Sequence, residues 1–145
     1  PTQAQIEIAA LAWETCIAAT VIHYINDVIA DMGDMVPPSY GSLDNFTNLT
    51  KHWGEMKGFA LGLQFSPVSP FRTTETIGGI DGTEALRRVL SLMGDAPVLA
   101  DGSQGGVAAS GTAAEALAAY EAKLLEARDL MQEAYALNPD AVSIW

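Results

Sequence analysis

The longest element that the sequence predicts is a helix over residues 3–32, and its length constrains the whole fold. The segment opens with TQAQ, in which the threonine can cap the helix and the second glutamine can reach back to it, the pattern of a capping box. Gly33 can end this helix, and Pro37 and Pro38 cannot continue it. At 1.5 Å per residue the helix is about 45 Å long. The remaining residues therefore have to cover a long rod.

Helix breakers divide the rest of the chain into three more helical segments. The second runs over residues 43–65, up to a proline, and the third runs over residues 83–93 and ends at Gly94. The fourth begins with the capping box TAAE and ends before Pro139. In this fourth segment apolar residues recur at steps of three and four, which is typical of a seam in a helix bundle. The residues of the seam are Leu117, Tyr120, Leu124, Ala127, Met131 and Ala134.

No segment shows the alternation of a β-strand. Two long stretches without clear periodicity, SPVSPFRTTETIGGIDG and DAPVLADGSQGGVAASG, separate the last three helices. The chain has 145 residues, 49% of them apolar, which is enough for a real core and excludes a disordered chain. We therefore predict an all-α fold, an up-and-down helix bundle of four helical segments with two long irregular loops. A single helical domain would span residues 1–145.

Charge and apolar content exclude several classes of partner. Eighteen acidic and seven basic residues give a net charge of −11, so a nucleic acid or an anionic membrane surface would repel the chain. The longest apolar run, CIAATVI, is too short to span a bilayer, and we predict no transmembrane segment. The chain begins at Pro1 without a methionine, which indicates a processed chain or a fragment. The helical neighbours of Cys16, the only cysteine, predict a buried and inert thiol.

Three glycines spaced four residues apart interrupt the second helical segment. Gly54, Gly58 and Gly62 fall in one narrow stripe on a helical wheel, and each costs the helix about 1 kcal/mol relative to alanine. A stripe of hydrogen atoms lets another helix approach closely, which compensates that loss through dispersion contacts. Close helix packing is therefore the prediction, and room for a ligand is the functional alternative.

Four polar residues on the first two helices are candidate metal ligands. His52 and Glu55 lie one turn apart on the apolar, inward side of the second helix, where both could bind one metal or pair with each other. His23 and Asp27 belong to a polar stripe in the second half of the first helix, together with Asp31. If the two helices pack antiparallel, His23 and Asp27 could face His52 and Glu55. Two imidazoles and two carboxylates would suit iron or zinc. The alternative for His52 and Glu55 is a pair at the edge of the surface or a hydrogen bond with each other at a partly buried site. For His23 the alternative is a core histidine bonded to a backbone carbonyl or a carboxylate.

Several segments together resemble the imelysin-like family of bacterial proteins. They are AATVIHYINDVIADM, KHWGEMKGFALGLQFSP, LMGDAPVLA and YEAKLLEARDLMQEAYAL, which occur in the family's order and cover most of the chain. The most specific part is the H-x-x-E helix followed by MKGFALGLQF. The H-x-x-E motif of the family maps onto His52 and Glu55, although this chain has Thr50 where the family has a glycine.

The resemblance implies an all-α protein built from helix bundles, secreted or lipid-anchored, in a periplasmic or extracellular setting, with a link to iron uptake. Relatives of this type are much longer, so the chain would correspond to their C-terminal portion. Three functions follow as hypotheses. The first is a metal- or ligand-binding protein without enzymatic activity. The second is a metallopeptidase-like hydrolase with Glu55 as the base. The third is a structural or interaction subunit that uses the glycine stripe and Trp53 for assembly.

A second protein chain is the partner that the sequence predicts. The first helix is apolar around most of its circumference between Ala9 and Ile22, and the third helix is only about three turns long. The other helices would then leave apolar faces of the first and second helices uncovered, and large uncovered faces of this kind mark interfaces. The partner would be an identical copy or the N-terminal portion of the same protein.

Overall fold

The computed structural model describes all residues, 1–145, and the chain is predominantly helical. The all-α class that the sequence predicts is confirmed. The elements in chain order are α1 (Gln3–Gly33), α2 (Leu43–Gly62) with a 3-10 turn η1 (Leu63–Phe65), α3 (Pro70–Thr73), β1 (Thr76–Ile77), β2 (Ile80–Asp81), α4 (Gly82–Leu92), α5 (Ala113–Ala134) and α6 (Pro139–Val142).

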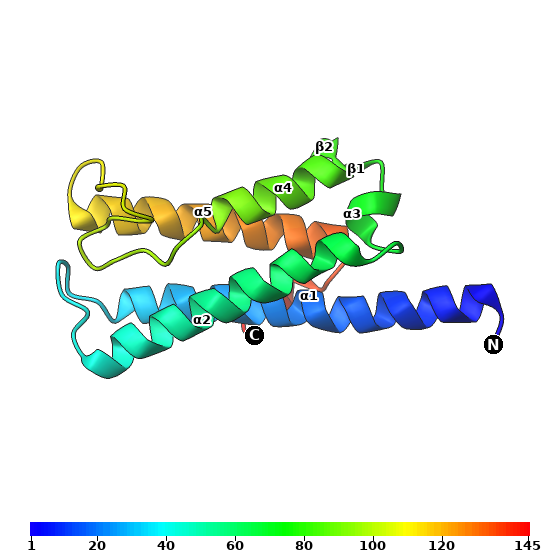
Figure 1. The fold of residues 1–145 in the computed structure, drawn as a ribbon, viewed down its shortest axis with the longest axis horizontal. Helices are drawn as coiled ribbons and strands as arrows, with labels where there is room; N and C mark the ends of the chain where they lie inside the picture. Colours follow the sequence, from blue (N-terminus) through cyan, green and yellow to red (C-terminus); the bar gives the residue numbers. More distant parts are fainter.

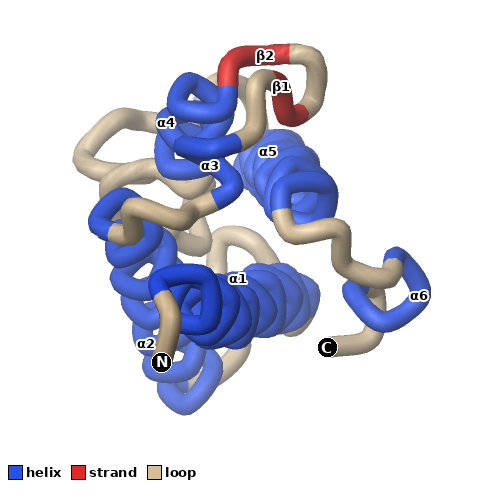
Figure 2. The backbone as a smooth tube through the Cα atoms, turned by 90° about the vertical axis from the view of Figure 1, so that its right-hand side faces the viewer, coloured by secondary structure: helices blue, strands red, loops and turns tan.

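Four helices carry the fold and lie in two pairs. α1 packs along α2, α4 packs along α5, and α1 also contacts α5 (Figure 1). Seen along the bundle, α4 and α5 lie on one side and α1 and α2 on the other (Figure 2). The apolar core fills the space between the pairs. Met56 of α2, Leu124 of α5 and Ile25 of α1 are all fully buried there.

Local capping chemistry explains where the helices begin. Thr2 and Gln5 form the predicted capping box at the start of α1, and Thr112 and Glu115 form the second one at the start of α5. α2 has its own cap, because the Ser42 hydroxyl accepts a hydrogen bond from the backbone of the third helical residue. The seam predicted for α5 is buried from Leu117 to Met131, with Ala134 half-buried at its end.

Side chains of α2 and α5 donate hydrogen bonds to the carbonyl groups at the C-terminal end of α4, which have no partners within the helix. The Lys57 ammonium donates to the carbonyl oxygens of Leu90 and Gly94, both at 2.6 Å. The Trp53 indole N–H donates to the Met93 carbonyl oxygen at 3.1 Å. A cation at a helix C-terminus is favourable, so these bonds tie α4 to the α1–α2 pair. Trp53 thus makes a hydrogen bond within this chain.

The first irregular stretch contains short elements that the sequence did not predict. α3 and the two-residue strands β1 and β2 lie between α2 and α4, and Ile77 of β1 is buried in the core. The strands are paired around Gly78 and Gly79, both of which have positive φ. Strands of two residues are too short to show alternation in the sequence, so only the turn signal was visible.

The glycine stripe does not pack against another helix of this chain, and this prediction is wrong. A Cβ atom added at Gly54, Gly58 or Gly62 would meet no atom within 4 Å. All three glycines are exposed, because the core-facing residues of α2 lie on the opposite side of the helix. The wheel located the stripe correctly but could not say which helix face the rest of the chain covers.

Two expectations for α1 also need correction or qualification. Cys16 is exposed rather than buried, because the covered side of α1 begins only around Glu14 and turns away from the thiol.

The whole helix is long and apolar enough to cross a membrane by length and composition alone. Its second half, however, supplies the bundle core with Val21, Ile22 and Ile25, and a core helix of a soluble protein passes the same test.

We expect Gly82→Ala to destabilise the fold. A Cβ atom there would lie 2.7 Å from the Thr74 carbonyl oxygen and 2.9 Å from that of Phe71, and backbone atoms cannot move aside easily. Overpacking of this kind costs about 1–3 kcal/mol. Gly33→Ala is the matched control, because no atom lies within 4 Å of its added Cβ. Urea denaturation should show a lower midpoint for Gly82→Ala only, and equal midpoints would contradict the tight turn before α4.

Candidate metal centre

The shortest polar contact between α1 and α2 joins His52 to Asp31. The Nδ1 atom of His52 lies 2.8 Å from Oδ2 of Asp31, and both side chains are largely buried. Since an ionised carboxylate can only accept, the geometry assigns the proton to Nδ1 of His52 as the donor. In the neutral imidazole Nε2 then carries the free lone pair.

Asp27 lies one turn before Asp31 and approaches two imidazoles. Its Oδ2 atom is 3.3 Å from Nε2 of His23 and 3.9 Å from Nε2 of His52. His23 comes from the same helix at the i, i+4 spacing, and its side chain is 50% exposed. The expected alternative for His23, a core histidine, is therefore wrong. One carboxylate oxygen and two imidazole nitrogens from two helices converge at the edge of the helix pair.

Tyr24 and Glu55 form the neighbouring part of the same surface. The Tyr24 ring stacks between His52 and Phe59, with centroid distances of 5.9 and 6.1 Å. Burial raises the pKa of Tyr24, and a hydrogen bond with Glu55 and the charges of Glu55 and Asp27 raise it further. Oε2 of Glu55 is buried without a hydrogen-bond partner, and the Lys51 ammonium is 3.9 Å away from it. Glu55 thus makes its contacts with Tyr24 and Lys51 and holds an unsatisfied oxygen beside the cluster.

Electrostatics in the cluster reflect an excess of carboxylates. Burial raises the pKa of Asp31 above its ordinary value, while the hydrogen bond and the charge of His52 act in the opposite direction. The negative charge of Asp27 adds to the upward shift of this pKa. A cation between Asp27 and Asp31 would relieve this repulsion.

Three of the four metal ligands predicted from the sequence lie together in the structure. His23, Asp27 and His52 meet because α1 and α2 pack antiparallel, as expected, whereas Glu55 faces Tyr24. Asp31 was recognised as part of the polar stripe on α1 but not as a site residue. Its signal was the i, i+4 spacing from Asp27, which places both carboxylates on one helix face. As the side chains stand, no three histidine, cysteine or carboxylate side chains have the geometry of a formed metal site.

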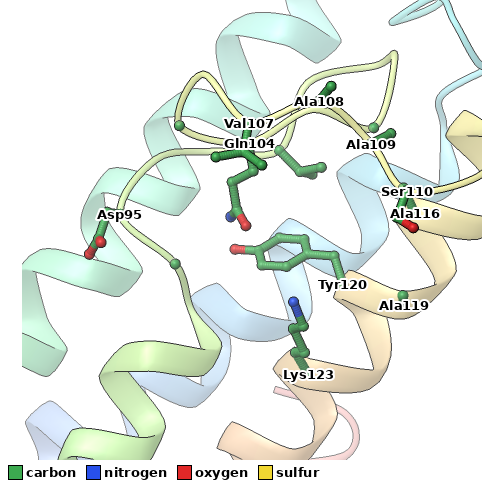
Figure 3. A pocket seen from close by; sticks show the side chains of 14 residues that line it. Asp95, Gln104, Val107, Ala108, Ala109, Ser110, Ala116, Ala119, Tyr120 and Lys123 are labelled. Carbon is green, nitrogen blue, oxygen red and sulfur yellow. The ribbon is translucent and has the colours of Figure 1, made fainter.

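A second hollow lies between the loop after α4 and α5 and encloses about 440 Å³ (Figure 3). Tyr120 and Gln104 point into it. The Tyr120 hydroxyl donates to the Met93 carbonyl oxygen at 2.7 Å and accepts from the Trp53 indole. The Gln104 amide donates to the Ala96 carbonyl oxygen at 2.8 Å. These polar groups hold the loop in place, so the His–Asp cluster is the better candidate site.

Comparisons with known proteins add no assignment. The sequence matches no protein-family model, no curated protein and no solved structure. The resemblance to imelysin-like proteins therefore stays a prediction, and the site is argued from its own residues.

We expect Asp31→Asn to change how stability depends on pH. Because the pKa of Asp31 is raised in the native state, the native protein holds this proton to a higher pH than the unfolded chain. Its contribution to stability is complete below the ordinary aspartate pKa and is lost as pH rises through the raised value. Asparagine does not titrate, so the free energy of unfolding of the variant should gain on that of the wild type across this window. Urea denaturation at a series of pH values measures the difference, and a constant difference would contradict the raised pKa.

Proposed function

We propose that this protein binds a divalent metal ion between α1 and α2, with His23, Asp27 and His52 as ligands. The observation that carries the proposal is the position of the Asp27 carboxylate, 3.3 Å from one imidazole Nε2 and 3.9 Å from the other. In a tetrahedral zinc site with bonds of roughly 2.0–2.1 Å, neighbouring donor atoms lie about 3.3 Å apart. Small rotations of the His23 and Asp27 side chains, which are 50% and 31% exposed, would therefore bring the three donors to ligand distance.

Asp31 supports the proposal from outside the ligand set. Metal-binding histidines commonly donate their second ring N–H to a carboxylate, which fixes the tautomer and makes the ligand more basic. The bond of 2.8 Å from His52 Nδ1 to Asp31 is such a contact, and it leaves Nε2, which lies 3.9 Å from Oδ2 of Asp27, as the nitrogen that would bind the metal. A purely structural histidine would gain equally from this bond, but it would not need a second carboxylate near Nε2.

Nearby charge and an unsatisfied oxygen also favour a cation. Oε2 of Glu55 is buried and accepts no hydrogen bond, because the Lys51 ammonium at 3.9 Å is too far away to donate one. The net charge of −11 raises the local concentration of cations around the whole protein. Imidazole with carboxylate suits zinc and iron, among other metals. From the resemblance to imelysin-like proteins we further propose that the protein acts outside the cytoplasm, in the periplasm or at the cell surface, in the handling of iron.

Titration calorimetry with Zn²⁺, and with Fe²⁺ under anaerobic conditions, tests the site. We expect one metal ion per chain, and His52→Ala should abolish this binding because it removes a ligand from α2. Asp31→Asn leaves all three ligands in place and should weaken affinity about 10–100-fold, as loss of a supporting carboxylate does in other metal sites.

Asp95→Asn is the control for the change in charge, because the Asp95 side chain is fully exposed and lies outside the cluster. It should bind metal as the wild type does. Far-UV circular dichroism confirms that each variant keeps its helices. Unchanged stoichiometry and affinity in His52→Ala would rule out the proposed site.

A further inference from the structure

The first 13 residues of the chain form an overhang, the term used below for residues 1–13. All of them are exposed, and the burial of α1 begins at Glu14, whose carboxylate accepts a hydrogen bond from the Tyr135 hydroxyl at 2.5 Å. Figure 1 shows this end of α1 running on past the other helices. The overhang carries large apolar side chains, with Trp13 74% and Ile6 51% exposed. Single exposed apolar residues are ordinary, but a cluster of this size on one helix marks an interface.

One face of the overhang continues the face of α1 that binds α2. Within the bundle, Tyr24, Asp27 and Asp31 of α1 contact α2 through His52 and Phe59. Counting back from Asp31 in alternating steps of four and three residues gives a heptad pattern that extends beyond the end of α2. Its members are Asp31, Asp27, Tyr24, Thr20, Ile17, Trp13, Ala10 and Ile6. The overhang therefore presents a helix-binding face with no helix of this chain on it.

The outward side of α2 is a matching surface, opposite the residues that enter the core. It consists of Gly54, Gly58, Leu61 and Phe65, again at steps of four and three residues, with Gly62 beside them. Phe65 is 78% exposed, and nothing lies within 4 Å of a Cβ added at any of the three glycines. This outward stripe carries no charge, and the overhang carries only Glu7. Depletion of charge is typical of the core of an interface.

We propose that the two surfaces bind each other in a symmetric dimer of this chain. A two-fold axis near the C-terminal end of α2 would place the second copy's α2 end to end with the first. The overhang of each copy would then lie on the outward stripe of the other copy, so that each α2 is sandwiched between its own α1 and the overhang of the partner. Both uncovered surfaces are buried by one symmetry operation, and the contact closes without leaving a free copy of either surface.

A second copy of the chain is favoured over other partners, because the overhang continues the face of α1 that already contacts α2. The overhang needs a helix in line with α2, and a symmetry-related α2 supplies one with an outward face of small and apolar residues. Glycines there let the large Trp13 and Ile6 side chains approach the helix backbone. Each copy would contribute both surfaces, so the contact between the overhang and the outward stripe would form twice in the dimer. A bilayer fits less well, since an overhang of roughly 20 Å is shorter than a hydrocarbon core of about 30 Å.

Sedimentation equilibrium of the full chain tests the dimer. The wild type is expected at twice the chain mass of 15.3 kDa. Trp13→Glu alters the overhang and Gly58→Gln alters the stripe, and both should sediment as monomers. Neither change disturbs the monomer, because Trp13 is exposed and the space around Gly58 is open. Gly58→Gln should even raise helix content, since glutamine is the better helix former, which separates loss of the dimer from loss of the fold.

Val36→Glu is the matched control, because Val36 is 70% exposed and lies at the opposite end of α1 from the overhang. This variant should remain a dimer. A monomeric wild type at all concentrations would overturn the proposal, as would a dimer that survives both Trp13→Glu and Gly58→Gln. Flotation with neutral phosphatidylcholine vesicles covers the competing occupant. Vesicle binding that depends on Trp13, by a wild type that is monomeric in solution, would assign the overhang to membranes and also overturn the dimer.

Discussion

The contact between α1 and α2 is the interaction on which the rest of the structure depends. Two hydrogen bonds to Asp31 fix the register of this helix pair. Its carboxylate accepts from His52, and its backbone carbonyl accepts from the Asn45 side chain at 3.1 Å. The Asn45 amide also donates to the Tyr40 carbonyl oxygen, so the connection between the helices is held by the same residue. A slip of one turn would leave these buried polar groups unpaired, which is costly.

This register determines what else α2 can do. With His52 opposite Asp31, the Tyr24 ring falls between His52 and Phe59, and Asp27 comes near both imidazoles. The same rotation of α2 turns Trp53 and Lys57 toward the end of α4, where they complete its carbonyl groups. It also turns the glycines away from the core. The candidate metal centre, the α4 anchor and the outward stripe are therefore three sides of one helix whose orientation α1 sets.

Features that depend on residues close together in the sequence could be predicted. Features that depend on which face of a helix the rest of the chain covers could not. Thr2 and Thr112 cap their helices through residues three positions away, so both starts could be predicted. The glycine stripe was placed on one helix face but given the wrong surroundings, and Cys16 was predicted to be buried but is exposed, because a helical pattern does not say where partner helices end. His23, Asp27 and His52 could be grouped once antiparallel packing was assumed. Asp31 was missed as a site residue, although its i, i+4 spacing from Asp27 places it on the same helix face.

The three glycines of α2 have an energetic cost that the structure of the monomer does not explain. Each costs a helix about 1 kcal/mol relative to alanine, so together they cost about 3 kcal/mol against a total stability of about 5–15 kcal/mol for a typical domain. Within the monomer nothing compensates this loss, since no atom of the chain lies near Gly54, Gly58 or Gly62. A turn or positive φ does not explain them either, because all three are in regular helix. In the proposed dimer the overhang of a second copy covers these glycines, and the dispersion contacts made there would offset the loss.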